Sequence, residues 1–216
     1  MADRVVIVGA GAGGKFAKEI LETAGSDPVG YLDNFVPTDT QVLGAPVLGG
    51  WDLLDDPSFV SEFGFVITLG NMQARWDVLK ILRARGARLA NAIHPGAAVS
   101  KYAKIGQGVL INVTAHVLPD AQIADSVQIE GHCSVGVDCV IEENVAFGTG
   151  VQINGSSVIE SHTFMGACSV VIPKVTVARS CYVGAGAVVT KNTEPGQLLF
   201  GMPAKVVKPS PWIVSD

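Results

Sequence analysis

Hydrophobic residues recur at every sixth position through the second half of the chain. From Ile93 to Val189, all seventeen of these positions hold Ile, Val, Phe or Met. Four places after each of them, from 97 to 193, only Ala, Val, Cys, Ser or Thr occur. A period of six is typical of a short strand and a corner repeated along a solenoid. The pattern predicts that both columns, one bulky and one small, point into the coil.

Three six-residue faces would close one triangular coil of about 18 residues. Successive coils would then stack at about 4.8 Å, like neighbouring strands of a sheet. Parallel stacking satisfies the backbone groups between coils but leaves the ends and the flat walls of the prism uncovered. Trimerisation, or a cap formed by the N-terminal domain, would supply that cover.

The first 90 or so residues alternate in the manner of an α/β unit. Three or four strands of a small parallel sheet are expected here, and the clearest are Val5–Val8, Val29–Leu32 and Phe65–Leu69. Helical spacing indicates helices over Lys15–Ala24, Pro57–Phe63 and Met72–Gly86. We therefore expect two domains, a small Rossmann-like α/β domain over residues 1–90 and a parallel β-solenoid over residues 91–216.

Composition and charge exclude several classes of protein. The net charge of −5, with 15 Lys and Arg spread along the chain, is not that of a nucleic-acid-binding protein. No apolar run reaches the length of a membrane span, and the opening residues reach a glycine cluster too early for a signal peptide. We expect a cytoplasmic protein with neither nucleic acid nor membrane as a partner.

The four cysteines match neither a metal-binding pair nor a redox motif, which favours reduced thiols. Three of them fall in the small inward column, where a thiol packs as a small hydrophobe, whereas the fourth lies one place earlier and is expected to be exposed. The inward three are Cys133, Cys139 and Cys181, and the fourth is Cys168.

A glycine motif, Gly9-x-Gly11-x-x-Gly14, follows the first predicted strand, and Asp33 comes 19 residues after its last glycine. The motif matches the dinucleotide fingerprint, but only half of a dinucleotide-binding fold precedes the repeats. A second interpretation is that the backbone N–H groups hold one diphosphate while Asp33 and Asn34 hold the nucleoside. A third is a tight turn without a ligand.

Four stretches and the six-residue repeat together resemble one family. The stretches are Val8–Gly14, Tyr31–Phe35, Leu69–Arg75 and Phe200–Val207. The sequence is similar to the bacterial nucleotide-sugar acetyltransferases typified by PglD and NeuD. This resemblance implies a left-handed β-helix, a homotrimer, and transfer of an acetyl group from acetyl-CoA to an amino or hydroxyl group of a nucleotide-linked sugar. A metal is not expected.

The resemblance also implies two binding sites. The matching positions for the nucleotide-linked sugar are Gly9, Gly11, Ala12, Gly13, Asp33, Asn34, Gly70, Asn71 and Arg75. Those for acetyl-CoA, which would thread between neighbouring prisms, are Gly148, Gly150, Gly166, Ala167, Gly184 and Ala185. Corner geometry alone explains such glycines equally well. Lys191, Lys205 and Lys208 either meet the CoA phosphates or are only solvated.

The sequence departs from the family at the general base. The family has a histidine, then a carboxylate, then Cys-Val-Ile, whereas this chain has Val137 and Asp138 before Cys-Val-Ile. Two further family histidines are replaced by Ala146 and Gly13. Because valine cannot accept a proton, either His132 or His116 acts as base, or the acceptor amine arrives neutral, or the chain does not catalyse acetyl transfer. Asp138, at the position of the family's carboxylate, is a third candidate catalytic residue.

Two non-catalytic alternatives follow from that substitution, a nucleotide-sugar-binding homologue and, less favoured, an NAD-binding sensor fused to a solenoid. His94 is expected to be structural and His162 to be an exposed surface residue. The histidines fall on different predicted walls, which argues against a zinc site. The sequence names neither the sugar, nor the acceptor atom, nor the acyl group.

Overall fold

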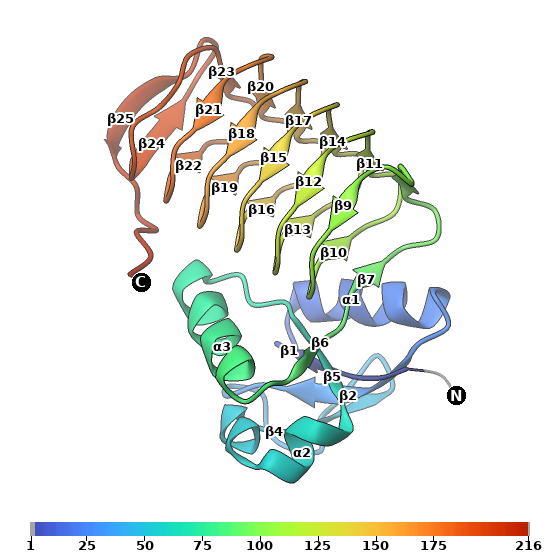
Figure 1. Ribbon diagram of the computed structural model, residues 1–216. Helices are drawn as coiled ribbons and strands as arrows, with labels where there is room; N and C mark the ends of the chain where they lie inside the picture. The colour runs from blue at the N-terminus through green and yellow to red at the C-terminus, as the bar shows by residue number, and fades with distance from the viewer. Residues whose placement is uncertain (1–2, 216) are drawn as a thin grey trace. The chain divides into compact units, whose positions relative to one another are not determined.

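The computed structural model describes residues 3–215 of the chain (Figure 1). Two compact units separate in it, Met1–Pro95 and Gly96–Asp216. Across the described residues, no helix is both long enough and apolar enough to cross a membrane.

The first unit contains a six-stranded sheet in the order β3-β4-β2-β1-β5-β6. Its central strands are parallel, and only the β3–β4 hairpin is antiparallel. The strands are β1 (Arg4–Val8), β2 (Asp27–Leu32), β3 (Gln41–Val42), β4 (Ala45–Gly49), β5 (Gly64–Ile67) and β6 (Arg88–Leu89), followed by β7 (Ala92–Ile93). The expected three or four strands were too few, because β3 and β6 are only two residues long and show no period.

Three α-helices and one 3₁₀ helix connect these strands. They are α1 (Ala12–Thr23), η1 (Trp51–Asp55), α2 (Pro57–Glu62) and α3 (Met72–Ala84). Asp56 and Asn71 cap α2 and α3 with side-chain oxygens that accept backbone N–H groups. By contrast, α1 begins after Gly11 with no side-chain cap from any described residue. The first N–H groups of α1 therefore point outward without a side-chain acceptor.

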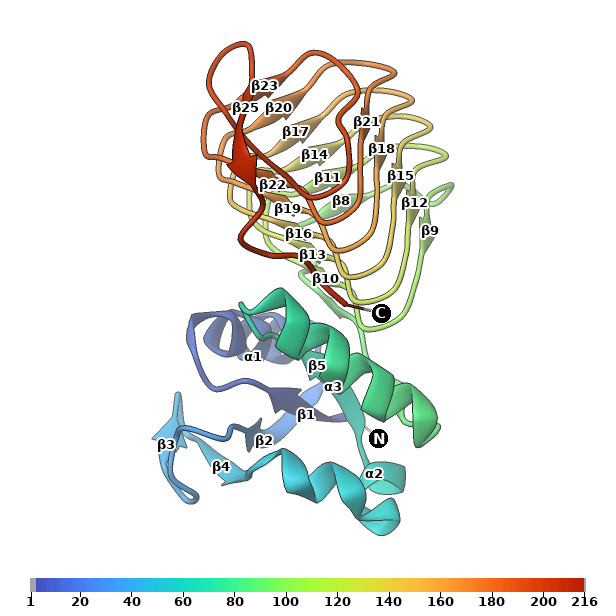
Figure 2. The same cartoon turned by 90° about the vertical axis from the view of Figure 1, so that its left-hand side faces the viewer.

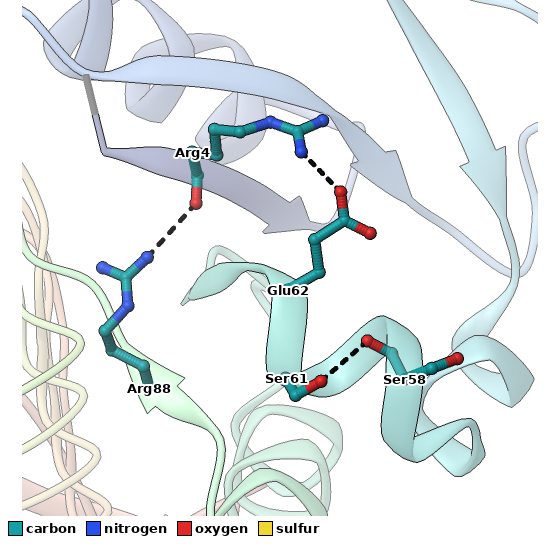
Figure 3. A network of polar contacts seen from close by, with 5 residues as sticks. All are labelled: Arg4, Ser58, Ser61, Glu62 and Arg88. Carbon is teal, nitrogen blue, oxygen red and sulfur yellow. Dashed lines mark hydrogen bonds and ion pairs between the residues drawn. The ribbon is translucent and has the colours of Figure 1, made fainter. Parts of the chain in front are cut away.

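The core of this unit forms where α2, η1 and α3 pack on one face of the sheet. Val6 and Val8 of β1 share a buried cluster with Val60 of α2 and Leu79 of α3. A rim of polar contacts closes this side, with Arg4 paired to Glu62 of α2 and Arg88 donating to the Arg4 carbonyl (Figure 3). Side chains of both members of the Arg4–Glu62 pair are half exposed, so it contributes at most about 1 kcal/mol.

The second unit winds through three sheets in turn, with strands of only two residues (Figures 1 and 2). The first sheet holds β8 (Ala98–Val99), β11 (His116–Val117), β14 (Ser134–Val135), β17 (Gln152–Ile153), β20 (Val170–Val171) and β23 (Val188–Val189). The second holds β9 (Lys104–Ile105), β12 (Gln122–Ile123), β15 (Val140–Ile141), β18 (Val158–Ile159) and β21 (Thr176–Val177). The third holds β10 (Leu110–Ile111), β13 (Gln128–Ile129), β16 (Ala146–Phe147), β19 (Phe164–Met165) and β22 (Tyr182–Val183), and ends in the hairpin of β24 (Gln197–Phe200) and β25 (Lys205–Pro209).

Each coil stacks in parallel on the next, in the register that the period of six predicts. His116 lies opposite Ser134, and Ile123 lies opposite Ile141. The second residue of each strand belongs to the bulky column, which is fully buried from Ile111 to Val189. Both inward columns predicted from the sequence are therefore present.

A left-handed backbone conformation at each corner lets the chain turn between walls. The fourth position of the repeat has a φ of about +60° at residues of several types, including His132 (61°), Asp138 (58°) and Cys168 (57°). L-residues adopt this region at a cost of about 1 kcal/mol. At most of these positions the backbone N–H donates to a carbonyl of the preceding coil, as Asn144 does to Asp125 over 3.1 Å. The His132 N–H donates instead to the Thr114 hydroxyl of that coil.

The prediction for the four cysteines is confirmed, and the prediction for His162 is wrong. Cys168 is exposed and the other three thiols are buried, as predicted, and burial raises the pKa of Cys133 to about 11. His162 was predicted to be exposed, which is wrong, since only 3% of it is accessible. Its corner column is buried along its length, and its Nδ1 lies 3.0 Å from Asn144 Nδ2.

The C-terminal residues return along the third sheet. Trp212 packs edge-on against Phe164 and Tyr182, with ring centroids 4.9 and 4.8 Å apart. Phe200 of the hairpin lies over Gly184, so that a Cβ at Gly184 would come within 2.0 Å of the Phe200 ring. The last coil is therefore covered by its own tail.

Candidate functional site

The carboxyl ends of β1, β2 and β5 bring together the glycine turn, Asp33 and the segment after Thr68. Gly9 has a φ of +110°, and a Cβ there would lie 3.0 Å from the Thr68 hydroxyl. A Cβ at Gly13 would lie 2.7 Å from the Thr68 carbonyl, and one at Gly14 only 2.0 Å from the Gly9 carbonyl. Close approach of backbones therefore requires glycine at these positions whether or not a ligand binds.

The Asp33 carboxylate fixes the glycine turn from the end of β2. Its Oδ2 accepts a hydrogen bond from the Ala10 N–H at 2.8 Å. Its Oδ1 accepts from the N–H groups of Phe35 and Val36, at 2.8 and 3.1 Å. Asn34 is occupied in the same way, since its Oδ1 accepts from the Trp51 N–H at 2.8 Å. Both side chains thus fix the conformation of the loops around the site by accepting hydrogen bonds from backbone N–H groups.

We expect Asp33→Asn to destabilise the first unit by about 1–2 kcal/mol. The carboxylate accepts three backbone N–H groups, and an amide in its place presents a donor to at least one of them. Urea unfolding followed by tryptophan fluorescence measures the change. Asp39→Asn, at an exposed residue of the same unit, is the control, and an equal loss in both variants would contradict the assigned role.

Exposed backbone remains at the start of α1 and before α3. Gly11, Ala12, Gly70 and Asn71 are exposed. Phe35, which follows Asp33 and Asn34 in the sequence, is 90% exposed. The Asn71 side chain is already committed to capping α3, where it accepts from the Ala74 N–H at 2.9 Å. The uncapped N-terminus of α1 is suited to an anionic group such as a phosphate.

Arg75 differs from the other residues predicted for this site because its side chain is 1% exposed. Burial lowers its pKa to about 9, and its Nη2 contacts the Met72 sulfur at 3.6 Å. The structure does not place this guanidinium on the exposed surface that carries Gly11 and Gly70.

In the second unit, small residues line one corner over successive coils. The corner between the third and the first sheet carries Gly148, Gly150, Gly166, Ala167, Gly184 and Ala185. A Cβ at Gly148 would lie 2.8 Å from the Ala167 nitrogen, and one at Gly166 would lie 2.6 Å from the Ala185 nitrogen. Coil stacking therefore accounts for these glycines, while Ala167 and Ala185 are exposed. We call this corner the small-residue corner.

Lysines gather at the C-terminal end of the coils. Lys191 and Lys205 line one cavity of about 270 Å³ together with Thr190 and Asn192. Lys208 lies on β25 opposite Leu198 and is exposed, but it is not part of the cavity lining.

The wall formed by the first sheet holds the residues considered for the base. Val137 and Asp138 lie at its far corner, where Val137 is 41% exposed. His116 is exposed on β11, next to Ser134 of the neighbouring coil. His132 lies at the near corner, and its Nδ1 is 3.0 Å from the Thr114 hydroxyl. The length of β14 separates His132 from Val137, so His132 does not fill the position of Val137.

Thr114 was missed by sequence reasoning although a signal was present. It precedes His132 by 18 residues, the length of one coil, and therefore occupies the same corner one coil earlier. Within residues 3–215, the structure brings no three His, Cys, Asp or Glu side chains together as a metal site.

Comparisons with known proteins agree with both units. Residues 4–82 match the family model of the PglD N-terminal domain. A histidine-to-asparagine mutant of perosamine N-acetyltransferase from Caulobacter crescentus, in complex with CoA and GDP-perosamine, is 29% identical with a TM-score of 0.89 and covers 96% of this chain and 98% of its own. The acetyltransferase domain of PglB from Neisseria gonorrhoeae is 28% identical with a TM-score of 0.89, over 94% of this chain and 99% of its own. Among the curated proteins, none matches the chain.

A likeness of fold alone extends to WeeI from Acinetobacter baumannii, at 22% identity and a TM-score of 0.85 over 95% of this chain and all of its own. An α/β unit of this topology followed by stacked parallel coils is the architecture of an acyltransferase, and this chain is one. More particularly, it resembles the PglD-like sugar acetyltransferases, through the match of residues 4–82 to the PglD N-terminal domain and through a similar fold along nearly the whole chain.

Proposed function

We propose that the protein transfers an acetyl group from acetyl-CoA to an amino or hydroxyl group of a nucleotide-linked sugar. The observation that carries the proposal is similarity along nearly the whole chain to enzymes of this kind. One was crystallised with CoA and GDP-perosamine, and the PglB acetyltransferase domain was crystallised with acetyl-CoA. We further propose a cytoplasmic homotrimer with a left-handed coil, a nucleotide-sugar domain over residues 1–90 and an acyltransferase domain over residues 91–216.

The nucleotide-linked sugar is assigned to the carboxyl edge of the first sheet. The N–H groups at the start of α1, after Gly11, would hold a phosphate group, since they are exposed and the helix dipole favours an anion there. Asp33 and Asn34 would act mainly by fixing the loops that surround the nucleoside. Arg75 contributes to the same site only if the ligand reaches a side chain that is buried here.

Acetyl-CoA is assigned to the small-residue corner. Exposed Ala167 and Ala185 leave the backbone open to the pantetheine arm, and Lys191 and Lys205 beyond them carry the positive charge that suits the phosphates. The acceptor nitrogen attacks the thioester carbonyl, a C–N bond forms, the C–S bond breaks, and the amine proton ends on the CoA thiol. Backbone N–H groups of the corner would stabilise the oxyanion. Direct binding of both reactants supplies proximity.

The test is release of free CoA thiol from acetyl-CoA in the presence of GDP-, UDP- and dTDP-linked amino sugars, GDP-perosamine among them. We expect turnover with at least one of these compounds and an acetylated sugar of the corresponding mass. Lack of turnover with every acceptor, in protein that still binds nucleotide sugar, would overturn acetyl transfer. The matched control replaces the amino sugar by the same nucleotide linked to a sugar without an amino group.

One observation favours a second candidate, a non-catalytic nucleotide-sugar-binding homologue. Val137 stands where the PglD-like pattern expects the histidine base, and it cannot move a proton. That candidate predicts thermal stabilisation by nucleotide sugars with none by CoA, whereas the NAD-binding sensor predicts stabilisation by NAD alone. Acetyl transfer predicts stabilisation by both nucleotide sugar and CoA.

A further inference from the structure

The Thr114 hydroxyl lies among three polar atoms whose roles can be assigned. Its Oγ1 is 2.5 Å from the Val113 carbonyl oxygen, 3.1 Å from the backbone nitrogen of His132 and 3.0 Å from His132 Nδ1. A carbonyl oxygen only accepts and a backbone N–H only donates, so these two contacts have one possible direction each. The direction of the third follows from the position of the single hydroxyl hydrogen.

That hydrogen must lie between Thr114 and Val113. Two oxygen atoms 2.5 Å apart repel each other unless a hydrogen joins them, and the Val113 carbonyl has none to give. The Thr114 oxygen is then left with lone pairs only. It accepts from the His132 backbone N–H, and it can pair with Nδ1 only if Nδ1 carries a hydrogen. Neutral His132 is therefore the Nδ1–H tautomer, with the lone pair on Nε2.

The ring is held at the end of the small-residue corner. Gly150 occupies the next coil at the same corner, where its N–H donates to the Gly131 carbonyl at 3.0 Å. Gly150 has no side chain, and the Cys168 sulfur lies 3.1 Å from the point where a Cβ at Gly150 would be. His132 is exposed, and no described residue makes a hydrogen bond to its Nε2. Gly166 and Gly148 lie on successive coils that lead toward this ring, a path of about 10 Å at 4.8 Å per coil, whereas Phe200 covers Gly184.

We propose that His132 is the general base of the acetyl transfer and that Thr114 is its positioning residue. The inference rests on the proposed function and adds the identity of the base, which replaces the histidine missing at Val137. The order along the corner is consistent with it, because lysines at the C-terminal end would hold the phosphates and the thioester would reach the opposite end, beside His132.

The proton path is complete with these groups. The acceptor amine attacks the thioester carbonyl, and Nε2 removes a proton from the nitrogen as the C–N bond forms. The resulting imidazolium keeps its Nδ1–H bond to Thr114 and returns the Nε2 proton to the sulfur as the C–S bond breaks. The products are the amide and the CoA thiol, and His132 is neutral again in its original tautomer.

Four other titratable groups lie on the elements around His132. Glu130 accepts from Asn112 at 3.0 Å, Cys133 points inward, Cys168 lies two coils further along the same corner, and His116 lies next to Ser134 on the wall. None of them is hydrogen bonded to the ring among the described residues.

The tautomer can be measured without any activity. Long-range ¹H–¹⁵N spectra of the full-length protein above neutral pH should give His132 a protonated Nδ1 and an unprotonated Nε2, with the signal assigned by its loss in His132→Gly. Thr114→Val should abolish this preference, and Thr114→Ser should keep it. A protonated Nε2 in the wild-type protein would overturn the inference even if acetyl transfer is confirmed.

The kinetic test uses His132→Gly, because glycine adopts the positive φ of this corner without strain. With the acceptor that supports turnover, we expect kcat to fall about 10²- to 10⁴-fold, the usual contribution of a general base. Added imidazole should restore part of it, which a structural role would not allow. Thr114→Val should lower kcat about tenfold, the loss of one orienting hydrogen bond, with Thr176→Val on another wall as the matched control.

The outcomes separate the two levels of the proposal. Turnover in the wild-type protein with unchanged kcat in His132→Gly would overturn the base and leave acetyl transfer standing. Loss of activity in His116→Gln, with full activity in His132→Gly, would move the base to His116 and also overturn the inference. Absence of turnover with all acceptors, together with CoA binding, would overturn the proposed function, while the NMR result would still decide the tautomer.

Discussion

Gly14→Ala will lower the free energy of unfolding of the first unit by about 3 kcal/mol, the upper end of the cost of overpacking. The added methyl would lie 2.0 Å from the Gly9 carbonyl oxygen and 3.3 Å from the Tyr31 ring. The obstacle is backbone, held by the Gly9 N–H bond to the Leu32 carbonyl at 2.8 Å, so it cannot swing aside as a side chain would. Urea unfolding followed by the fluorescence of Trp51 and Trp76, both in this unit, measures the loss.

Gly11→Ala is the matched control three residues earlier in the same turn. No heavy atom of a described residue lies within 4 Å of a Cβ built at Gly11, and its φ of −78° suits any residue. The change should cost only about 1 kcal/mol, the typical loss when alanine replaces a favoured N-cap residue. Similar losses in the two variants would show that flexibility of the turn, rather than the contact with Gly9, makes glycine necessary.

The inside of the second unit was predictable because one physical rule acts at every repeat. A bulky residue that points inward stacks on another one coil away, so the period of the chain and the period of the fold coincide. Ile123 and Ile141 show this directly, since they lie opposite each other in neighbouring strands. Burial of Cys133 follows from the same rule, because it belongs to the small inward column, whereas Cys168 lies one place earlier, at a corner.

The period says nothing about which corners are covered. His132 and His162 occupy the same position of the repeat and have nearly the same φ, of 61° and 59°. One is exposed and the other buried, because they lie on different corners. The pairing of Thr114 with His132 is likewise a property of one corner, and it appears only when residues 18 apart are compared.

The glycine motif predicted a turn correctly but left its purpose open. Sequence reasoning offered Asp33 as a ligand for a nucleoside, and its carboxylate instead accepts three backbone N–H groups. Such bonds are invisible in the sequence, because the partners belong to the turn and to the loop after β2. The same holds for the Asn71 cap of α3.

Ile123→Ala will lower the stability of the second unit by about 2–5 kcal/mol, as is usual for the loss of a large aliphatic side chain from a close-packed core. Only 3% of Ile123 is exposed, and its strand β12 lies between β9 and β15. Because each coil packs mainly on its two neighbours, the cavity should loosen these strands first. Hydrogen exchange of the amides of β9, β12 and β15 locates the effect, and urea unfolding measures its size.

Gln122→Ala on the same two-residue strand is the control for the outer side of the wall. Gln122 is exposed in the single chain, so its loss should change stability by no more than about 0.5 kcal/mol. A large loss at Gln122 would contradict an open outer wall and would mean that this sheet is covered in solution. A second copy of the chain is the occupant expected there if the protein is a trimer, and the loss would then depend on protein concentration.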